Sequence, residues 1–133
     1  MKTLDHNKIS ELFYKVIKEE KSINSLIQEI KKGKLNLSQK YAYQAFCCAV
    51  LSKNSSSYLQ KGKYIKQYGL FISKSIEIDS NCVEARLIRF LIEKKLKNVK
   101  FIDHTSEDLK FLNQIFKSIE DVNIREIVLN IIS

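Results

Sequence analysis

Apolar residues along this 133-residue chain recur mainly at intervals of three and four positions, the spacing of one face of an α-helix. In residues 58–76, for example, Ile65, Ile72 and Ile76 fall on one stripe of such a helix. The spacing recurs up to the C-terminus, so we expect a chain of helices. It predicts seven of them, over residues 7–19, 22–32, 39–52, 58–76 and 82–94, from residue 105 or 106 onward, and over 122–132.

Short polar residues and glycines lie between or within these stripes and indicate where helices begin, end or meet. Gly33 occupies the place of a C-terminal cap. Gly69 lies inside a helix, where glycine costs about 1 kcal/mol relative to alanine, so we expect a close contact with a neighbouring helix there. The residues that we expect to cap helix N-termini are Ser22, Ser38, Ser57, Ser80 or Asn81, and Thr105 or Ser106.

The composition narrows the fold class to all-α. The chain has no proline and only three glycines, so the tight turns of a β-sandwich or β-barrel would be hard to build. Hydrophobic residues make up 44% and charged residues 29%, as in ordinary globular proteins. We therefore expect one domain over residues 1–133, built from about seven helices in antiparallel hairpins.

Charge and cysteine usage favour a cytoplasmic protein with no membrane partner. No apolar run approaches the roughly 18–20 residues of a membrane span, and the N-terminus is charged throughout, unlike a secretory signal. The chain has three cysteines, and two of them, Cys47 and Cys48, are adjacent in a predicted helix. Their side chains point about 100° apart, so a disulfide between them would be strained and reduced thiols are expected.

Residues 61–91 resemble the boundary between two tetratricopeptide repeats. The usual end of a repeat is a small residue, an aliphatic residue, Glu, Leu, Asp, Pro and Asn, and here it reads SIEIDSN, with Ser80 in place of the proline. The opening of a following repeat reads VEAR, at 83–86. The segments LFYKVIKEE, YAYQAFCCAVL and FIDHTSEDLKFL are also similar to a group of small uncharacterised bacterial helical proteins. The resemblance implies a right-handed stack of helix pairs, with no catalytic residues attached to it.

In tetratricopeptide stacks the first helix of each pair lines a concave face that binds extended peptides. This analogy places Gln44 and Cys48 on the helix over 39–52 at a partner surface. Arg86 and Arg89 lie one turn apart on the helix over 82–94 and could hold a carboxylate of a partner. The alternative is that they form ordinary surface ion pairs. The candidate partner-binding residues are Gln44, Cys48, Arg86, Arg89 and Lys94, and the alternative ion partners are Glu84, Glu93 and Glu120.

We expect no enzyme, no cofactor and no metal site. The sequence has no HExxH, no CxxC and no glycine-rich phosphate loop. Asp103 and His104 are adjacent in a loop, where they would be solvated rather than held as an oriented acid–base pair. Cys47 and Cys48 lack the spacing that brings two thiolates to one metal, so we expect them to pack in the core.

The net charge of +8 leaves two classes of function open. Only three of the 23 basic residues are arginines, and lysines occur along every predicted helix except the one over 122–132. We favour a protein-interaction module, adaptor-like, with a protein or peptide partner. The runner-up is nucleic-acid or anionic-surface binding through a lysine-rich face. A homodimer through the apolar helix over 122–132 is a further prediction, the alternative being that this helix caps the stack.

Overall fold

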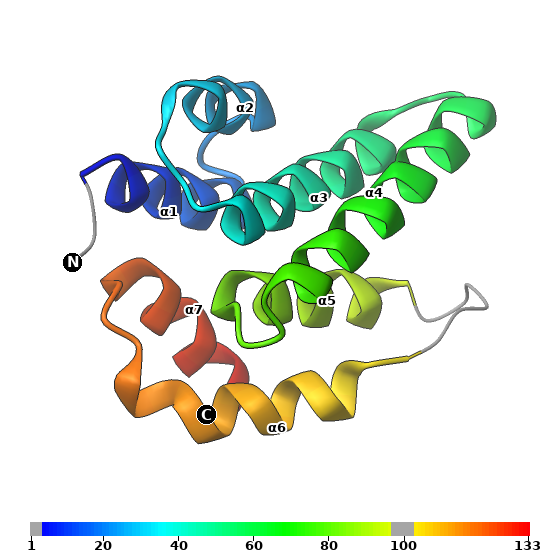
Figure 1. Cartoon of the computed structure of the whole chain (residues 1–133). Coiled ribbons are helices and arrows are strands. Elements are labelled where there is room, and N and C mark those ends of the chain that lie inside the picture. The colour runs from blue at the N-terminus through cyan, green and yellow to red at the C-terminus, as the bar shows by residue number, and fades with distance from the viewer. Residues whose placement is uncertain (1–3, 97–102) are drawn as a thin grey trace.

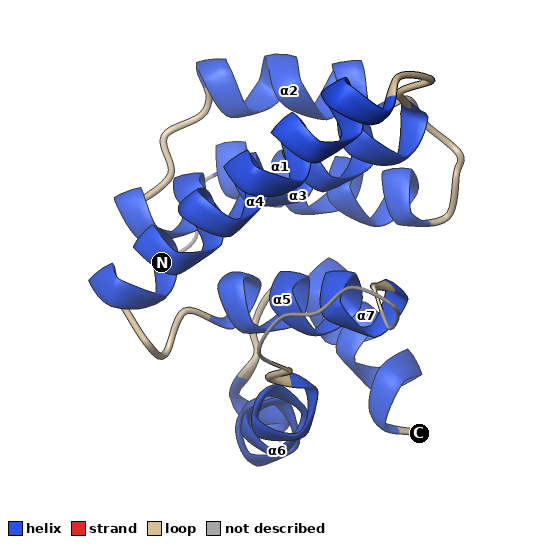
Figure 2. Cartoon of the chain, turned by 90° about the vertical axis from the view of Figure 1, so that its right-hand side faces the viewer, coloured by secondary structure: helices blue, strands red, loops and turns tan. Residues whose placement is uncertain are grey.

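The computed structural model describes residues 4–96 and 103–133, and this part of the chain contains seven α-helices and no strand (Figures 1 and 2). The all-α prediction is therefore confirmed, and the helices begin and end within a few residues of the predicted positions. A short 3-10 turn, Phe116–Ser118, follows the sixth helix. The helices are α1 Leu4–Ile17, α2 Ile23–Lys32, α3 Leu37–Asn54, α4 Tyr58–Ile78, α5 Val83–Lys95, α6 Thr105–Ile115 and α7 Val122–Ile132.

The start of α3 differs from the prediction, because Ser38 is not its cap. The side chain of Asn36 accepts a hydrogen bond from the backbone N–H of Gln39 at 2.8 Å, and the Gln39 side chain accepts one from the Asn36 backbone at 3.3 Å. This reciprocal capping box satisfies two helix N–H groups and starts α3 two residues earlier. Ser38 is instead buried against α4, where it bonds with Ser75.

The other helix starts vary in how they are capped. Ser57 caps α4 as predicted, since its hydroxyl accepts a hydrogen bond from the Gln60 backbone. Ser22 holds the cap position of α2 but makes no side-chain capping bond. The expectations for α5 and α6 are wrong, because the residues at the cap positions are Cys82 and His104.

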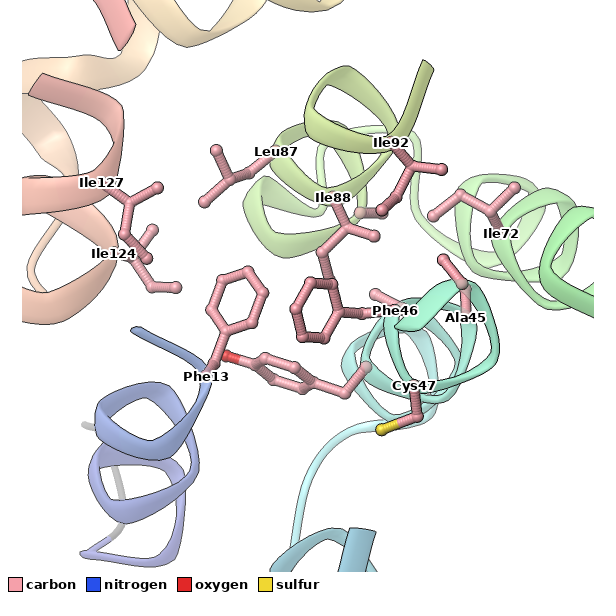
Figure 3. Close-up of a cluster of buried hydrophobic side chains, with 14 of the residues drawn as sticks. Phe13, Ala45, Phe46, Cys47, Ile72, Leu87, Ile88, Ile92, Ile124 and Ile127 are labelled. Carbon is pink, nitrogen blue, oxygen red and sulfur yellow. The ribbon is translucent and has the colours of Figure 1, made fainter. Parts of the chain in front are cut away.

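Helix α3 lies at the centre of the hydrophobic core, and nine of its residues are buried (Figure 3). Phe13 of α1 meets Phe46 edge to face, with ring centroids 4.7 Å apart. Ile88 of α5 is fully buried in the same cluster. Such edge-to-face aromatic pairs stabilise the core beyond what the burial of their apolar area contributes.

The chain closes on itself, because its last described helix packs against its first (Figure 1). Ser10 of α1 donates a hydrogen bond to Asp121, the cap of α7, at 3.0 Å, and both residues are buried. In a simple linear stack of repeats each unit would contact only its neighbours. The tetratricopeptide-like stacking therefore stays a prediction.

Two further expectations concern single helix faces. Gly69 meets no neighbouring atom within 4 Å of the place where a Cβ would stand, so the predicted close helix contact there is wrong. In α7, Ile131 and Ile132 are half-buried against the core, whereas Val122 is 72% exposed. The homodimer stays a prediction.

None of the described helices is both long and apolar enough to cross a membrane.

Candidate functional site

Arg86 and Arg89 do hold a carboxylate, but it belongs to this chain. Both guanidinium groups bind Asp108 in the first turn of α6, Arg89 through two hydrogen bonds and Arg86 through one at 3.3 Å. Both also reach Glu107, and the Arg86 guanidinium lies 4.8 Å from the centroid of the Phe111 ring. The fork predicted for a partner is thus filled by α6.

Two of the three expected alternative partners of the arginines, Glu84 and Glu93, are engaged by other residues. Glu84 is buried and accepts hydrogen bonds from Gln39 and from the thiol of Cys82. Glu93 is buried beside His104. Burial lowers the pKa of Arg89, but the hydrogen bonds and charge of Asp108 outweigh it and raise that pKa overall. The guanidinium therefore stays charged at any accessible pH.

His104 is not the solvated loop residue that we expected. Its Nδ1 lies 2.7 Å from one oxygen of Glu93, and its backbone N–H donates to the other oxygen at 2.6 Å. Glu93 is 7% exposed, so this contact anchors the start of α6 to α5. Both oxygens of the Glu93 carboxylate are thus engaged by one residue.

The other three residues predicted to bind a partner, Gln44, Cys48 and Lys94, share none of the contacts described above for the arginine pair. Cys48 is buried on α3, and its thiol donates to the side chain of Gln67 on α4 at 3.8 Å. Gln44 is half-buried on α3. Lys94 is exposed, with its ammonium 5.4 Å from the centroid of the Phe90 ring.

Cys47 and Cys48 pack in the core as expected, and Cys82 is buried as well. All three are buried and none forms a disulfide. Burial raises the pKa of the Cys47 thiol to about 12, with a smaller effect from Cys48, and burial raises that of Cys82 to about 11. Among residues 4–96 and 103–133, no three side chains of the metal-binding types gather at one place.

A groove that the sequence did not reveal opens beside α3. It has a volume of about 980 Å³ and is formed by the junction of α1 and α2, the C-terminal half of α3, the first turns of α4 and the end of α5. We call it the lysine-rimmed groove. Its apolar lining consists of Val16, Ile17, Ile23, Phe46, Ala49, Val50, Ile65, Leu91, Ile92 and Leu96.

The rim of this groove is mainly basic. The four lysines that line it are Lys21, Lys53, Lys61 and Lys95, against two acids, Glu19 and Glu20. Glu19 pairs with Lys53 at 3.8 Å, and Glu20 pairs with Lys18 at 3.5 Å. Lys21 and Lys95 are exposed and form no ion pair with a described carboxylate, so positive charge remains at the rim.

One sequence signal could have pointed to this side of the molecule. Residues 30–76 contain nine lysines and not one aspartate or glutamate, so this stretch alone exceeds the net charge of the chain, +8. The stretch covers the end of α2, all of α3 and nearly all of α4. The lysines are spread along the sequence, as noted above, but the acids are not.

Comparisons of the chain with protein-family models, with curated proteins and with solved structures return no match. The resemblance of residues 61–91 to a tetratricopeptide boundary therefore stays a prediction.

Proposed function

We propose that this protein is an interaction module, and that its lysine-rimmed groove binds an apolar segment of a partner protein flanked by acidic residues. The observation that carries the proposal is the groove itself, about 980 Å³ with an apolar lining drawn from five helices. None of the five residues predicted from the sequence lines it.

The chemistry of the groove fits a peptide segment. Its volume is at the upper end of the range for small-molecule sites, and it is partly open to solvent. Half-buried Ile17, Val50 and Leu91 offer the kind of surface that receives the apolar anchors of an amphipathic segment. Lys21 and Lys95 at the rim favour carboxylates on either side of those anchors, and they disfavour basic competitors.

Selection from a random peptide library, followed by fluorescence-polarisation titration, tests this proposal. We expect the selected peptides to combine two or three large apolar residues with Asp or Glu. Val50→Arg places a charged side chain in the groove and should weaken binding about tenfold or more. The matched control is Val122→Arg, the same change at an exposed valine of α7 that does not line the groove. Equal binding by both variants would exclude the groove as the binding surface.

A second candidate function is binding to an anionic surface through the α3–α4 hairpin. It is favoured by the absence of acidic residues from 30–76. Its test is the replacement of Lys63, Lys66 and Lys74 by glutamine, with binding to anionic polymers and vesicles measured against salt. If replacing Lys94, Lys110 and Lys117 instead had the same effect, the charge of the hairpin would have no special role.

A further inference from the structure

The turn that joins α3 to α4 presents two large apolar side chains to solvent. Tyr58 is 91% exposed and Leu59 is 85% exposed, and they are the first two residues of α4. The turn lies at the edge of the molecule, at the upper right in Figure 1. We call residues 53–63 the hairpin tip.

The hairpin tip is a fixed element rather than a loose loop. Ser57 caps α4, and Ser55 donates a hydrogen bond to the Leu51 carbonyl at 2.9 Å. Ser52 and Lys61 are joined across the hairpin by a hydrogen bond of 2.9 Å. Tyr58 and Leu59 are therefore held outward by the start of a regular helix.

Lysines continue from the hairpin tip along the outer face of α4. Leu59, Lys63, Lys66 and Leu70 are spaced by four, three and four positions, which places them on one face of the helix. All four are exposed, Leu70 at 60%. No acidic residue occurs in α4 before Glu77.

This mixture of side chains selects one kind of anion. Lysines attract any polyanion, but leucines gain nothing from a phosphate backbone in water. At the surface of an anionic bilayer both gain, because lysines meet lipid headgroups while leucine and tyrosine enter the interfacial region. Nucleic acid recognition relies more on arginine forks, and the three arginines of the chain lie outside α3 and α4.

We propose that the hairpin tip docks on an anionic lipid bilayer, with Tyr58 and Leu59 entering the headgroup region and Lys63 and Lys66 facing the lipid phosphates. This docking is peripheral, and it departs from the expectation that the protein has no membrane partner. The proposal rests on the second candidate function and narrows its anion to lipid. The four residues that it invokes do not line the groove.

Vesicle co-sedimentation gives the first test. Wild-type protein should bind vesicles that contain about 30% phosphatidylserine and not vesicles of phosphatidylcholine alone. Tyr58→Ser with Leu59→Ser should weaken binding about tenfold or more, because two apolar side chains no longer insert. Lys63→Gln with Lys66→Gln should weaken it about fivefold per lysine. The matched controls are Val122→Ser with Leu129→Ser, and Lys110→Gln with Lys117→Gln, all at exposed positions outside the hairpin.

Tryptophan fluorescence gives a second test that reads insertion directly. The chain has no tryptophan, so Leu59→Trp introduces a single reporter at the hairpin tip. Its emission should shift to the blue on anionic vesicles. Val122→Trp, on α7, should not shift.

The outcomes separate this inference from the function on which it rests. Binding that ignores Tyr58 and Leu59 but depends on the lysines would overturn insertion and leave anionic-surface binding standing. Binding to RNA or DNA without binding to vesicles would overturn the choice of lipid in the same way. Binding to none of these polyanions would overturn both.

Discussion

Arg89 and Asp108, 19 positions apart, form two hydrogen bonds that join α5 to α6: Nε donates to Oδ2 at 2.9 Å and Nη2 to Oδ1 at 2.8 Å. Asp108 is fully buried and Arg89 is 8% exposed. A bidentate pair of this kind fixes the relative position of two helices as well as their distance. With the bond from Arg86, Asp108 accepts three of the hydrogen bonds that join α5 to α6.

We predict that Asp108→Asn lowers the free energy of unfolding by about 3 kcal/mol, because it leaves the largely buried Arg89 guanidinium with only the exposed Glu107 as a contacting counter-charge. Urea unfolding followed by circular dichroism measures this loss. Glu107→Gln is the matched control: Glu107 contacts the same arginines but its side chain is 61% exposed, so the cost should stay below about 1 kcal/mol. Equal costs for the two variants would show that burial of Asp108 does not matter.

Ser38 and Ser75 join the beginning of α3 to the end of α4, and they allow a second prediction. Ser75 donates to the Ser38 carbonyl at 2.6 Å, and Ser38 donates to the Ser75 carbonyl at 2.9 Å, with both side chains buried. Ser75→Ala should cost about 1–2 kcal/mol of unfolding free energy, since it removes a buried hydrogen bond. Ser73→Ala, on the exposed face of the same helix, should be neutral or slightly stabilising. A neutral Ser75→Ala would mean that the Ser38 hydroxyl alone holds this end of the hairpin.

The positions of the helices could be predicted from the sequence because each depends on local apolar spacing. The residues that cap the helices were harder to predict. Asn36 and Ser38 both suit an N-cap, and the choice between them depends on Gln39 lying three residues after Asn36 and on the burial of Ser38 against Ser75. The second of these facts is a contact across 37 positions, which no local pattern contains.

The candidate site could be predicted only in part. Arg86 and Arg89 were identified as a carboxylate fork, but the carboxylate comes from α6, and which face α6 turns toward α5 is set by packing. The lysine-rimmed groove joins residues from five helices, each with an ordinary apolar stripe. The sequence of one helix does not show which residues of its apolar stripe are left uncovered by the neighbouring helices. The missing acids of residues 30–76, by contrast, were visible in the sequence.

Glu19 lies in the left-handed region, with φ of 62°, at the end of α1. Its backbone N–H bonds to the Val16 carbonyl, and that of Glu20 bonds to the Lys15 carbonyl, which is the Schellman arrangement that usually places glycine at this position. Glu19→Gly should therefore raise the free energy of unfolding by about 0.5–1 kcal/mol, measured by thermal and urea unfolding. The lost ion pair with Lys53 is exposed and costs little. Glu20→Gly, at a neighbour outside the left-handed region, should not stabilise, and a gain there equal to that of Glu19→Gly would contradict the strain at Glu19.

The buried thiols predict a loss of stability in alkali. In the folded protein the pKa of Cys47 is about 12 and that of Cys82 about 11, both raised mainly by burial from an ordinary value of 9.0. Above about pH 9 the unfolded chain therefore binds fewer protons than the folded one, and stability falls as pH rises.

Each such thiol should contribute a slope of up to about 1.4 kcal/mol per pH unit between its unfolded and folded pKa values, and nothing below about pH 8. Urea unfolding of wild type and of Cys47→Ala at a series of pH values measures the contribution of one thiol. Cys47→Ala should be less stable than wild type by a constant amount at neutral pH, from lost packing, and this difference should shrink as pH rises from about 9 toward 11. A difference that stays constant over that range would mean that Cys47 ionises as readily in the folded protein as in the unfolded chain.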